Sequence, residues 1–222
     1  MILEQIYEES THRLNEVRLL LIMIKSLEND KHPLVSNHAV QLSKGLFFVH
    51  LYGAYEHTIN TTLDQACRHI SSSSCPVREI KPRILSIILD DKFKPLLNPA
   101  TKKDMWKIKG DLMERSISTE HANLSETIIP TDGKNFRYEQ LDSIWKTFCL
   151  STEVLPRMLL RNTIEEIVNN RNAIAHGNES PILIGSRNTT SDLENKLNHM
   201  IEVCTHIVMS FEDYLLFQQF RR

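Results

Sequence analysis

An arginine on the apolar face of a helix, followed five residues later by a histidine, is the feature of this sequence best suited to chemistry. Arg171 lies four residues after Ile167 and three before Ile174, so it falls within the apolar stripe of the helix predicted over residues 163–176. A guanidinium cannot be neutralised and is costly to bury alone, so Arg171 must meet an anion in the protein or in a ligand. His176 ends the same helix, and histidine is a common proton-transfer side chain in enzymes. An arginine and a titratable histidine around one cleft suit a phosphodiester substrate.

The ends of this helix carry their own signals. Thr163 and Glu166 have the spacing of a capping box, and Gly177 stands where a left-handed C-terminal cap belongs. Asn172 lies four residues before His176 and therefore beneath it on the helix. We expect the helix to begin at Thr163 and to hold an amide and an imidazole at its C-terminal end.

Glu56 is a second charged residue within an apolar stripe. It follows Tyr52 by four residues in another long predicted helix. We expect Glu56 to pair with Arg171 or to orient His176. The alternative is a helix-surface carboxylate beside His57, with no part in the site.

The elements that must position these residues are long amphipathic helices. Glycine accounts for only 6 of 222 residues, which disfavours the tight hairpins of an all-β fold and the glycine-rich loops that cradle phosphates. With 41% apolar and 24% charged residues, the chain has an ordinary globular composition. We expect one all-α domain over residues 1–222, built as an up-and-down helical bundle. Helices are predicted over residues 2–30, 38–70, 101–116, 136–150, 163–176 and 191–220, with loops over 117–135 and 177–191.

Residues 76–135 are the least regular part of the chain and are expected to form an insertion. Within them, residues 84–89 are apolar enough for a short buried strand or helix. Residues 78–109 contain nine Lys or Arg and four Asp or Glu, a net charge of +5 in a chain whose formal net charge is −2. This stretch is either a footprint for a polyanion or a solvated lysine-rich surface. The candidate contacts to a nucleic acid are Lys102, Lys103, Lys107 and Lys109.

Cysteine spacing and apolar run lengths bear on cofactors and location. The four cysteines, Cys67, Cys75, Cys149 and Cys204, form no C-x-x-C pair, so we expect neither a structural metal nor a cofactor, and free thiols in a reducing compartment. The longest apolar run, residues 19–24, is too short for a membrane span, and the N-terminus lacks the apolar run of a signal peptide. We expect a cytoplasmic protein with no membrane partner.

The sequence NRNAIAHG over residues 170–177 resembles the R-x4–6-H motif of the HEPN superfamily. The resemblance implies an α-helical bundle that homodimerises, with the motif helices of two subunits forming one RNA-cleaving cleft. It implies a metal-independent endoribonuclease in which Arg171 binds the scissile phosphate and His176 acts as general base or acid. Asn172 would position the phosphate or His176. The basic stretch would guide the RNA strand.

Further details qualify the resemblance. The sequence GAYE over residues 53–56 is similar to a Gly-x-x-Glu element of some HEPN families, which adds Glu56 to the expected site. HEPN toxins silenced by nucleotidyl transfer carry a tyrosine two residues after the histidine, whereas Asn178 stands there in this chain. The resemblance further implies a toxin or anti-phage effector with an antitoxin or defence-system partner.

Two other functions remain open from the sequence. One is a non-catalytic HEPN module that binds RNA or nucleotide, or that dimerises within a larger complex. The other is a helical interaction protein with no nucleic-acid ligand.

Overall fold

The structure is a computed structural model that describes residues 1–29, 37–97, 101–124 and 135–222. Within these ranges all regular elements are helices and there is no β-strand, which confirms the expected all-α fold. The helices are α1 (Glu4–Asn29), α2 (Asn37–Ser72), a 3-10 turn η1 (Val77–Glu79), α3 (Pro82–Ile88), α4 (Asp90–Leu97), α5 (Lys102–Ser116), α6 (Tyr138–Phe148), α7 (Leu160–Ala175), α8 (Pro181–Ser186) and α9 (Thr190–Leu216).

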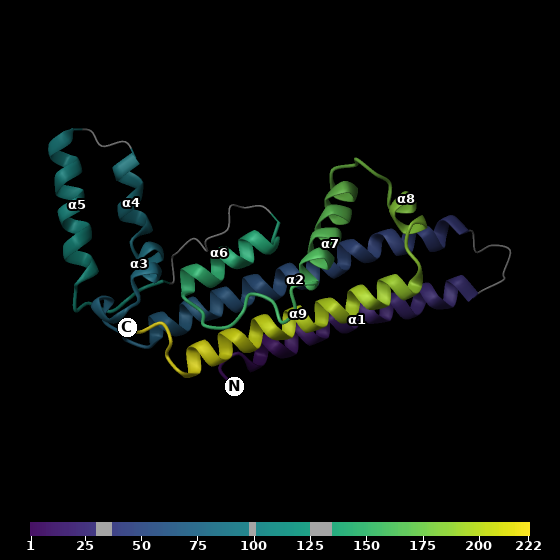
Figure 1. The fold of residues 1–222 in the computed structure, drawn as a ribbon, viewed down its shortest axis with the longest axis horizontal. Coiled ribbons are helices and arrows are strands. Elements are labelled where there is room, and N and C mark those ends of the chain that lie inside the picture. The colour runs from purple at the N-terminus through teal and green to yellow at the C-terminus, as the bar shows by residue number, and fades with distance from the viewer. Residues whose placement is uncertain (30–36, 98–100, 125–134) are drawn as a thin grey trace.

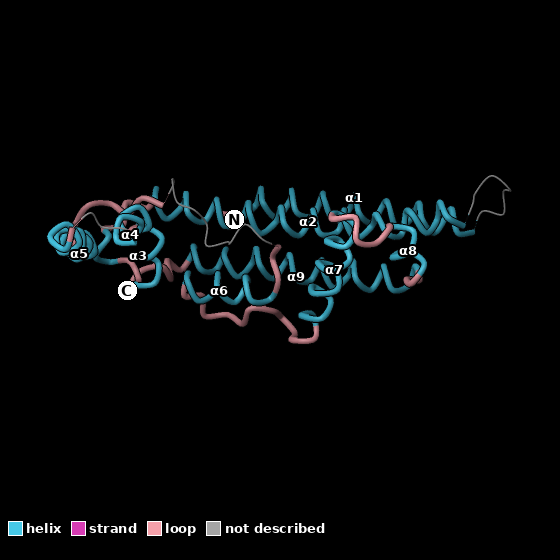
Figure 2. Tube along the Cα trace, turned by 90° about the horizontal axis from the view of Figure 1, so that it is seen from above, coloured by secondary structure: helices cyan, strands magenta, loops and turns pink. Residues whose placement is uncertain are grey.

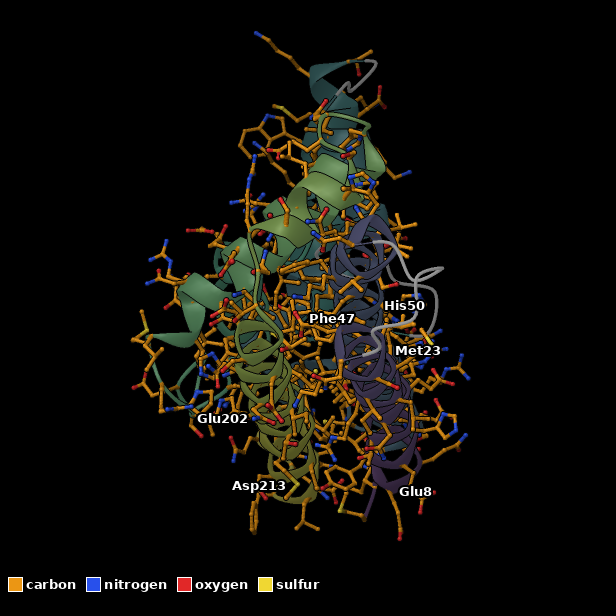
Figure 3. The ribbon with its side chains drawn as sticks, turned by 90° about the vertical axis from the view of Figure 1, so that its right-hand side faces the viewer. Glu8, Met23, Phe47, His50, Glu202 and Asp213 are labelled. Atoms are coloured by element: carbon orange, nitrogen blue, oxygen red, sulfur yellow. The ribbon has the colours of Figure 1, made fainter. Side chains whose placement is uncertain are left out.

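Three long helices, α1, α2 and α9, form the body of the protein. They lie side by side along the longest axis of the molecule, with α2 antiparallel to α1 (Figure 1). Figure 3 looks along this bundle and shows Phe47 between the helices, where the side chain is completely buried, while Met23 and His50 point outward. The core is continuous, because the apolar stripes of the three helices face one another. In the described ranges, no helix has the length and apolar character needed to cross a membrane.

Helices α3, α4 and α5 stand at one end of the bundle, and α7 and α8 lie toward the other end (Figures 1 and 2). The apolar segment 84–89, left open between strand and helix, is mostly α3, and its residues Ile84, Leu85 and Ile87 are buried. Thr101 caps α5 by accepting a hydrogen bond from the backbone N–H of Asp104 at 3.1 Å. The helix thus begins within one residue of the predicted start at residue 101. Most of the predicted loop over 117–135 lies outside the described residues.

The prediction of an unbroken loop over residues 177–191 is wrong, because Pro181–Ser186 form α8. This short helix packs against α2. Ser180 caps this short helix with its side-chain oxygen, and Pro181 takes the first helical position. The two backbones are so close that a Cβ on Gly185 would lie 1.8 Å from the carbonyl oxygen of Gln41. A Cβ on Gly45 would lie 2.0 Å from the carbonyl oxygen of Pro181. The two glycines therefore allow α8 to pack directly on the backbone of α2. The hydropathy pattern of residues 177–191 does not reveal this contact.

The capping box predicted at Thr163 is also wrong, because α7 begins at Leu160. Thr163 lies inside the helix, nearly buried, and its hydroxyl hydrogen-bonds Nδ1 of His199 at 2.9 Å. Glu166 reaches across to Lys196 instead of back to the helix start. The first turn of α7 is held by packing of Leu160 in the core, which overrides the local capping signal.

Candidate active site

Helix α7 presents one buried face and one C-terminal turn at the surface. Ile164, Ile167 and Val168 are completely buried, and α7 packs on α2 and α9. The stripe continues through Arg171, which is half-buried. Anchoring the aliphatic turns fixes the axis of the helix and so the place where Arg171 leaves it.

The guanidinium of Arg171 is held by neutral groups. Its Nη1 donates hydrogen bonds to Oδ1 of Asn135 at 2.9 Å and to Oδ1 of Asn172 at 3.0 Å. Its centre lies 4.7 Å from the centroid of the Tyr52 ring, a cation–π distance. Its Nε and Nη2 make no hydrogen bond to any described residue. Among the described residues, two of its three nitrogens therefore have no hydrogen-bond acceptor.

Arg171 differs from the other half-buried arginines of the described chain. Arg115, Arg137, Arg161 and Arg221 are each ion-paired to a carboxylate. No carboxylate among the described residues pairs with Arg171. A partly desolvated cation without a counter-ion attracts an anion more strongly than one already neutralised.

Glu56 reaches the site through Tyr52. The Tyr52 hydroxyl donates to Oε1 of Glu56 at 3.0 Å and accepts the backbone N–H of Phe136 at 3.2 Å. Burial, assisted by the charge of Glu56, raises the pKa of Tyr52 to about 12, so the phenol keeps its proton and remains a donor. Across the described residues no ion pair joins Glu56 to Arg171, and its part in the chemistry stays a prediction.

His176 caps the C-terminal end of α7 and is exposed. Beyond it Gly177 adopts φ of +69°, as predicted, and the N–H groups of Gly177 and Asn178 bond the carbonyls of Ile174 and Ala173. These two bonds form a Schellman motif, which fixes the direction in which the chain leaves the helix. The imidazole makes no hydrogen bond to a described side chain.

Arg171 and His176 share one end of the helix but not one face. Five residues correspond to about 500° of rotation, so their side chains leave the axis about 140° apart. The Asn172 amide holds Arg171, and the Asn172 carbonyl accepts the backbone N–H of His176 at 3.0 Å. The bond to His176 is an ordinary helical backbone bond, so only Arg171 meets the Asn172 side chain, and the positioning role expected for Asn172 stays a prediction.

The selected lysines, Lys102, Lys103, Lys107 and Lys109, are all exposed on α5. Both Figure 1 and Figure 2 place α5 at the end of the molecule away from α7. One subunit therefore does not bring these lysines to Arg171.

Sequence reasoning missed two residues that support the site. Tyr52 was noted only as part of an apolar stripe, although its spacing of four residues from Glu56 predicts a contact along the helix. Asn135 carries no local signal, since it is 36 residues from Arg171 and precedes α6. Within the described ranges no three His, Cys, Asp or Glu side chains gather in a way that could hold a metal ion.

Comparison with known proteins gives one result. The model of the HEPN_MAE_28990-like HEPN family matches residues 2–220. Neither the curated proteins nor the solved structures include a match to the chain.

Proposed function

The chain belongs to the HEPN_MAE_28990-like HEPN family, and on that premise we propose that it is a metal-independent endoribonuclease. Membership indicates a ribonuclease-like or nucleotide-binding role. The observation that favours cleavage is the state of Arg171, which is half-buried without a carboxylate partner among the described residues and has two nitrogens unused. A structural arginine would be expected to find a counter-ion, as the other half-buried ones do.

Arg171 binds the scissile phosphate. The Nε and Nη2 donors of one guanidinium match two oxygens of a phosphodiester, and such bidentate pairs are among the stronger hydrogen bonds. Tyr52 and Asn135 hold the group in place before substrate arrives. A preorganised cation stabilises the negative charge that grows on the phosphate during attack.

His176 transfers the protons. As general base it takes the proton of the neighbouring 2′-hydroxyl, whose oxygen bonds to phosphorus while the bond from phosphorus to the 5′-oxygen breaks. A general acid then supplies a proton to the departing 5′-oxygen. The products are a 2′,3′-cyclic phosphate and a 5′-hydroxyl, and no step calls for a metal ion.

A second subunit supplies the other proton-transfer group. The exposed His176 has no described side chain to orient it, and Arg171 leaves the helix on another side. In a homodimer with apposed α7 ends, one His176 acts as base, its partner's equivalent acts as acid, and both arginines face the phosphate. The homodimer and the composite cleft are part of this proposal.

A cleavage assay with matched variants tests the proposal. Wild-type protein should cleave total RNA in the presence of EDTA, and Arg171→Ala and His176→Ala should each lose about 100-fold or more in rate. Arg161→Ala is the control for Arg171, because Arg161 lies on the same helix, stacks 4.6 Å from the Tyr138 ring and is neutralised by Glu139. It should retain activity.

The same assay separates the remaining functions. RNA binding without cleavage by wild-type protein would support the non-catalytic HEPN module, and neither binding nor cleavage would support a helical interaction protein. A toxin or anti-phage role, and an antitoxin or defence-system partner, stay predictions drawn from the resemblance.

A further inference from the structure

Trp106 on α5 is mostly exposed to solvent. It keeps 68% of its surface accessible, whereas Trp145, the other tryptophan of the chain, keeps 3%. Tryptophan is usually largely buried, because its indole is the largest apolar side chain. The indole of Trp106 is therefore accessible to a ligand.

The residues of α5 that flank Trp106 on the helix surface are basic. At about 100° per residue, Lys102, Lys103 and Lys109 leave α5 within about 60° of Trp106. The acidic residues of the helix, Asp104, Asp111 and Glu114, all lie outside that sector. Leu112, the buried residue of α5, leaves the helix about 120° from Trp106.

One contact and one open position shape the surface around the indole. The Lys109 ammonium lies 4.8 Å from the centroid of the Trp106 ring, over one of its faces. Gly110 follows Trp106 by four residues, and a Cβ built there would meet nothing within 4 Å. Glycine weakens a helix interior, and no packing among the described residues requires it at Gly110. Its missing side chain leaves room for a flat group beside the indole.

We propose that Trp106 is a stacking platform for an unpaired base of single-stranded RNA, with Lys102, Lys103 and Lys109 contacting the flanking phosphates. An aromatic side chain beside cations is the arrangement that binds single strands, because bases stack on the ring while lysines neutralise the backbone. The choice of RNA as ligand rests on the proposed function. The platform extends that function, since it assigns a base-binding site on α5, at the end of the molecule away from α7 (Figure 1).

Equilibrium binding with two ligands tests the platform. His176→Ala protein keeps the RNA intact and serves as the parent. The ligands are a short oligoadenylate and an abasic ribose-phosphate oligomer of the same length. Adding Trp106→Ala should weaken oligoadenylate binding by at least about fivefold and leave binding of the abasic oligomer unchanged, because only bases stack.

The controls separate stacking from charge and from loss of structure. Phe217→Ala removes an aromatic side chain that is also 68% exposed, at the end of α9, and should change neither affinity. Lys102→Ala should weaken both ligands and reduce the salt dependence of binding. Oligoadenylate should also quench the emission of the exposed indole, and Trp106→Phe should abolish that quenching while circular dichroism shows unchanged helix content.

Three results would overturn the platform. They are unchanged oligoadenylate affinity in Trp106→Ala, an equal loss for both ligands, and no binding of oligoadenylate by the parent. Because cleavage is not measured, the two proposals fail separately. Wild-type protein that binds oligoadenylate through Trp106 but cuts no RNA would refute the nuclease and keep the platform.

Discussion

Replacing Tyr52 by phenylalanine isolates the hydrogen bonds beneath Arg171 from the ring that supports it. The substitution removes a hydroxyl that donates to Glu56 at 3.0 Å and accepts from the Phe136 N–H at 3.2 Å. The aromatic face under the guanidinium, 4.7 Å from its centre, is kept. Stability should therefore fall, while the cation–π support of Arg171 persists.

The magnitude follows from what each partner of Tyr52 loses. The N–H of Phe136 lies in a buried hydrogen bond, and leaving it without an acceptor costs about 1–2 kcal/mol. Glu56 is half-buried, so water can partly replace the lost Tyr52 hydroxyl as its hydrogen-bond donor. Losing this hydrogen bond therefore costs about 1 kcal/mol. The sum, about 2–3 kcal/mol, lowers the melting temperature of a chain of this size by about 4–12 °C.

Urea and thermal unfolding of Tyr52→Phe, with Tyr138→Phe as control, measure this cost. Tyr138 also lies under an arginine, at 4.6 Å, but its hydroxyl bonds no described side chain, so its loss should cost less than about 0.5 kcal/mol. Equal stability of the two variants would refute the hydrogen-bonded support of the site.

The raised pKa of Tyr52, about 12 because of burial, adds a pH dependence. Below the ordinary tyrosine pKa of about 10 the neutral phenol contributes stability in full, and that contribution is lost as the pH rises through 12. Tyr52→Phe should therefore lose less stability than wild type between pH 10 and pH 12.

Three other substitutions probe packing, charge and helix propensity. Gly185→Ala should cost at least about 2 kcal/mol in urea unfolding, because its Cβ would lie 1.8 Å from the Gln41 carbonyl oxygen and push α8 off α2; wild-type stability would contradict this contact. Gly110→Ala should raise stability by about 0.5–1 kcal/mol, since the added Cβ meets nothing within 4 Å, and a loss on melting would show hidden packing. Glu28→Gln should cost about 1–2 kcal/mol at pH 7, because it leaves the buried Lys44 ammonium unpaired while Glu28 itself is 42% exposed. The hydrogen bond from Lys44 lowers the pKa of Glu28, so the pair stabilises the fold above pH 4.5 and is lost as the pH falls through the lowered value; a variant difference that persists at pH 2 would contradict this assignment.

The long helices and the catalytic candidates were predictable because their signals are local. Apolar spacing located α1, α2 and α9 to within a few residues, and Gly177 marked the end of α7 through the positive φ that only a few residues adopt readily. Arg171 stood out because a charge interrupted an aliphatic stripe. Each of these signals lies within one or two helical turns.

The errors arose where the deciding contact is distant in sequence. Helix α8 depends on the close approach of Gly185 to α2, and Thr163 finds His199 in another helix instead of capping its own. One acceptor of Arg171 is its neighbour Asn172, but the other, Asn135, lies on a separate segment 36 residues away. A carboxylate partner was one of two expectations for Arg171, and among the described residues the structure shows amide and aromatic support instead.

The most direct test of the central claim is the chemistry of the cut ends. A defined RNA incubated with the protein in EDTA should yield a 2′,3′-cyclic phosphate and a 5′-hydroxyl, because the 2′-oxygen is the nucleophile. The same RNA with a single 2′-deoxy nucleotide on the 5′ side of the cleavage site should remain uncut there. Cleavage of the deoxy-substituted strand at that position, or products bearing a 3′-hydroxyl and a 5′-phosphate, would contradict the account.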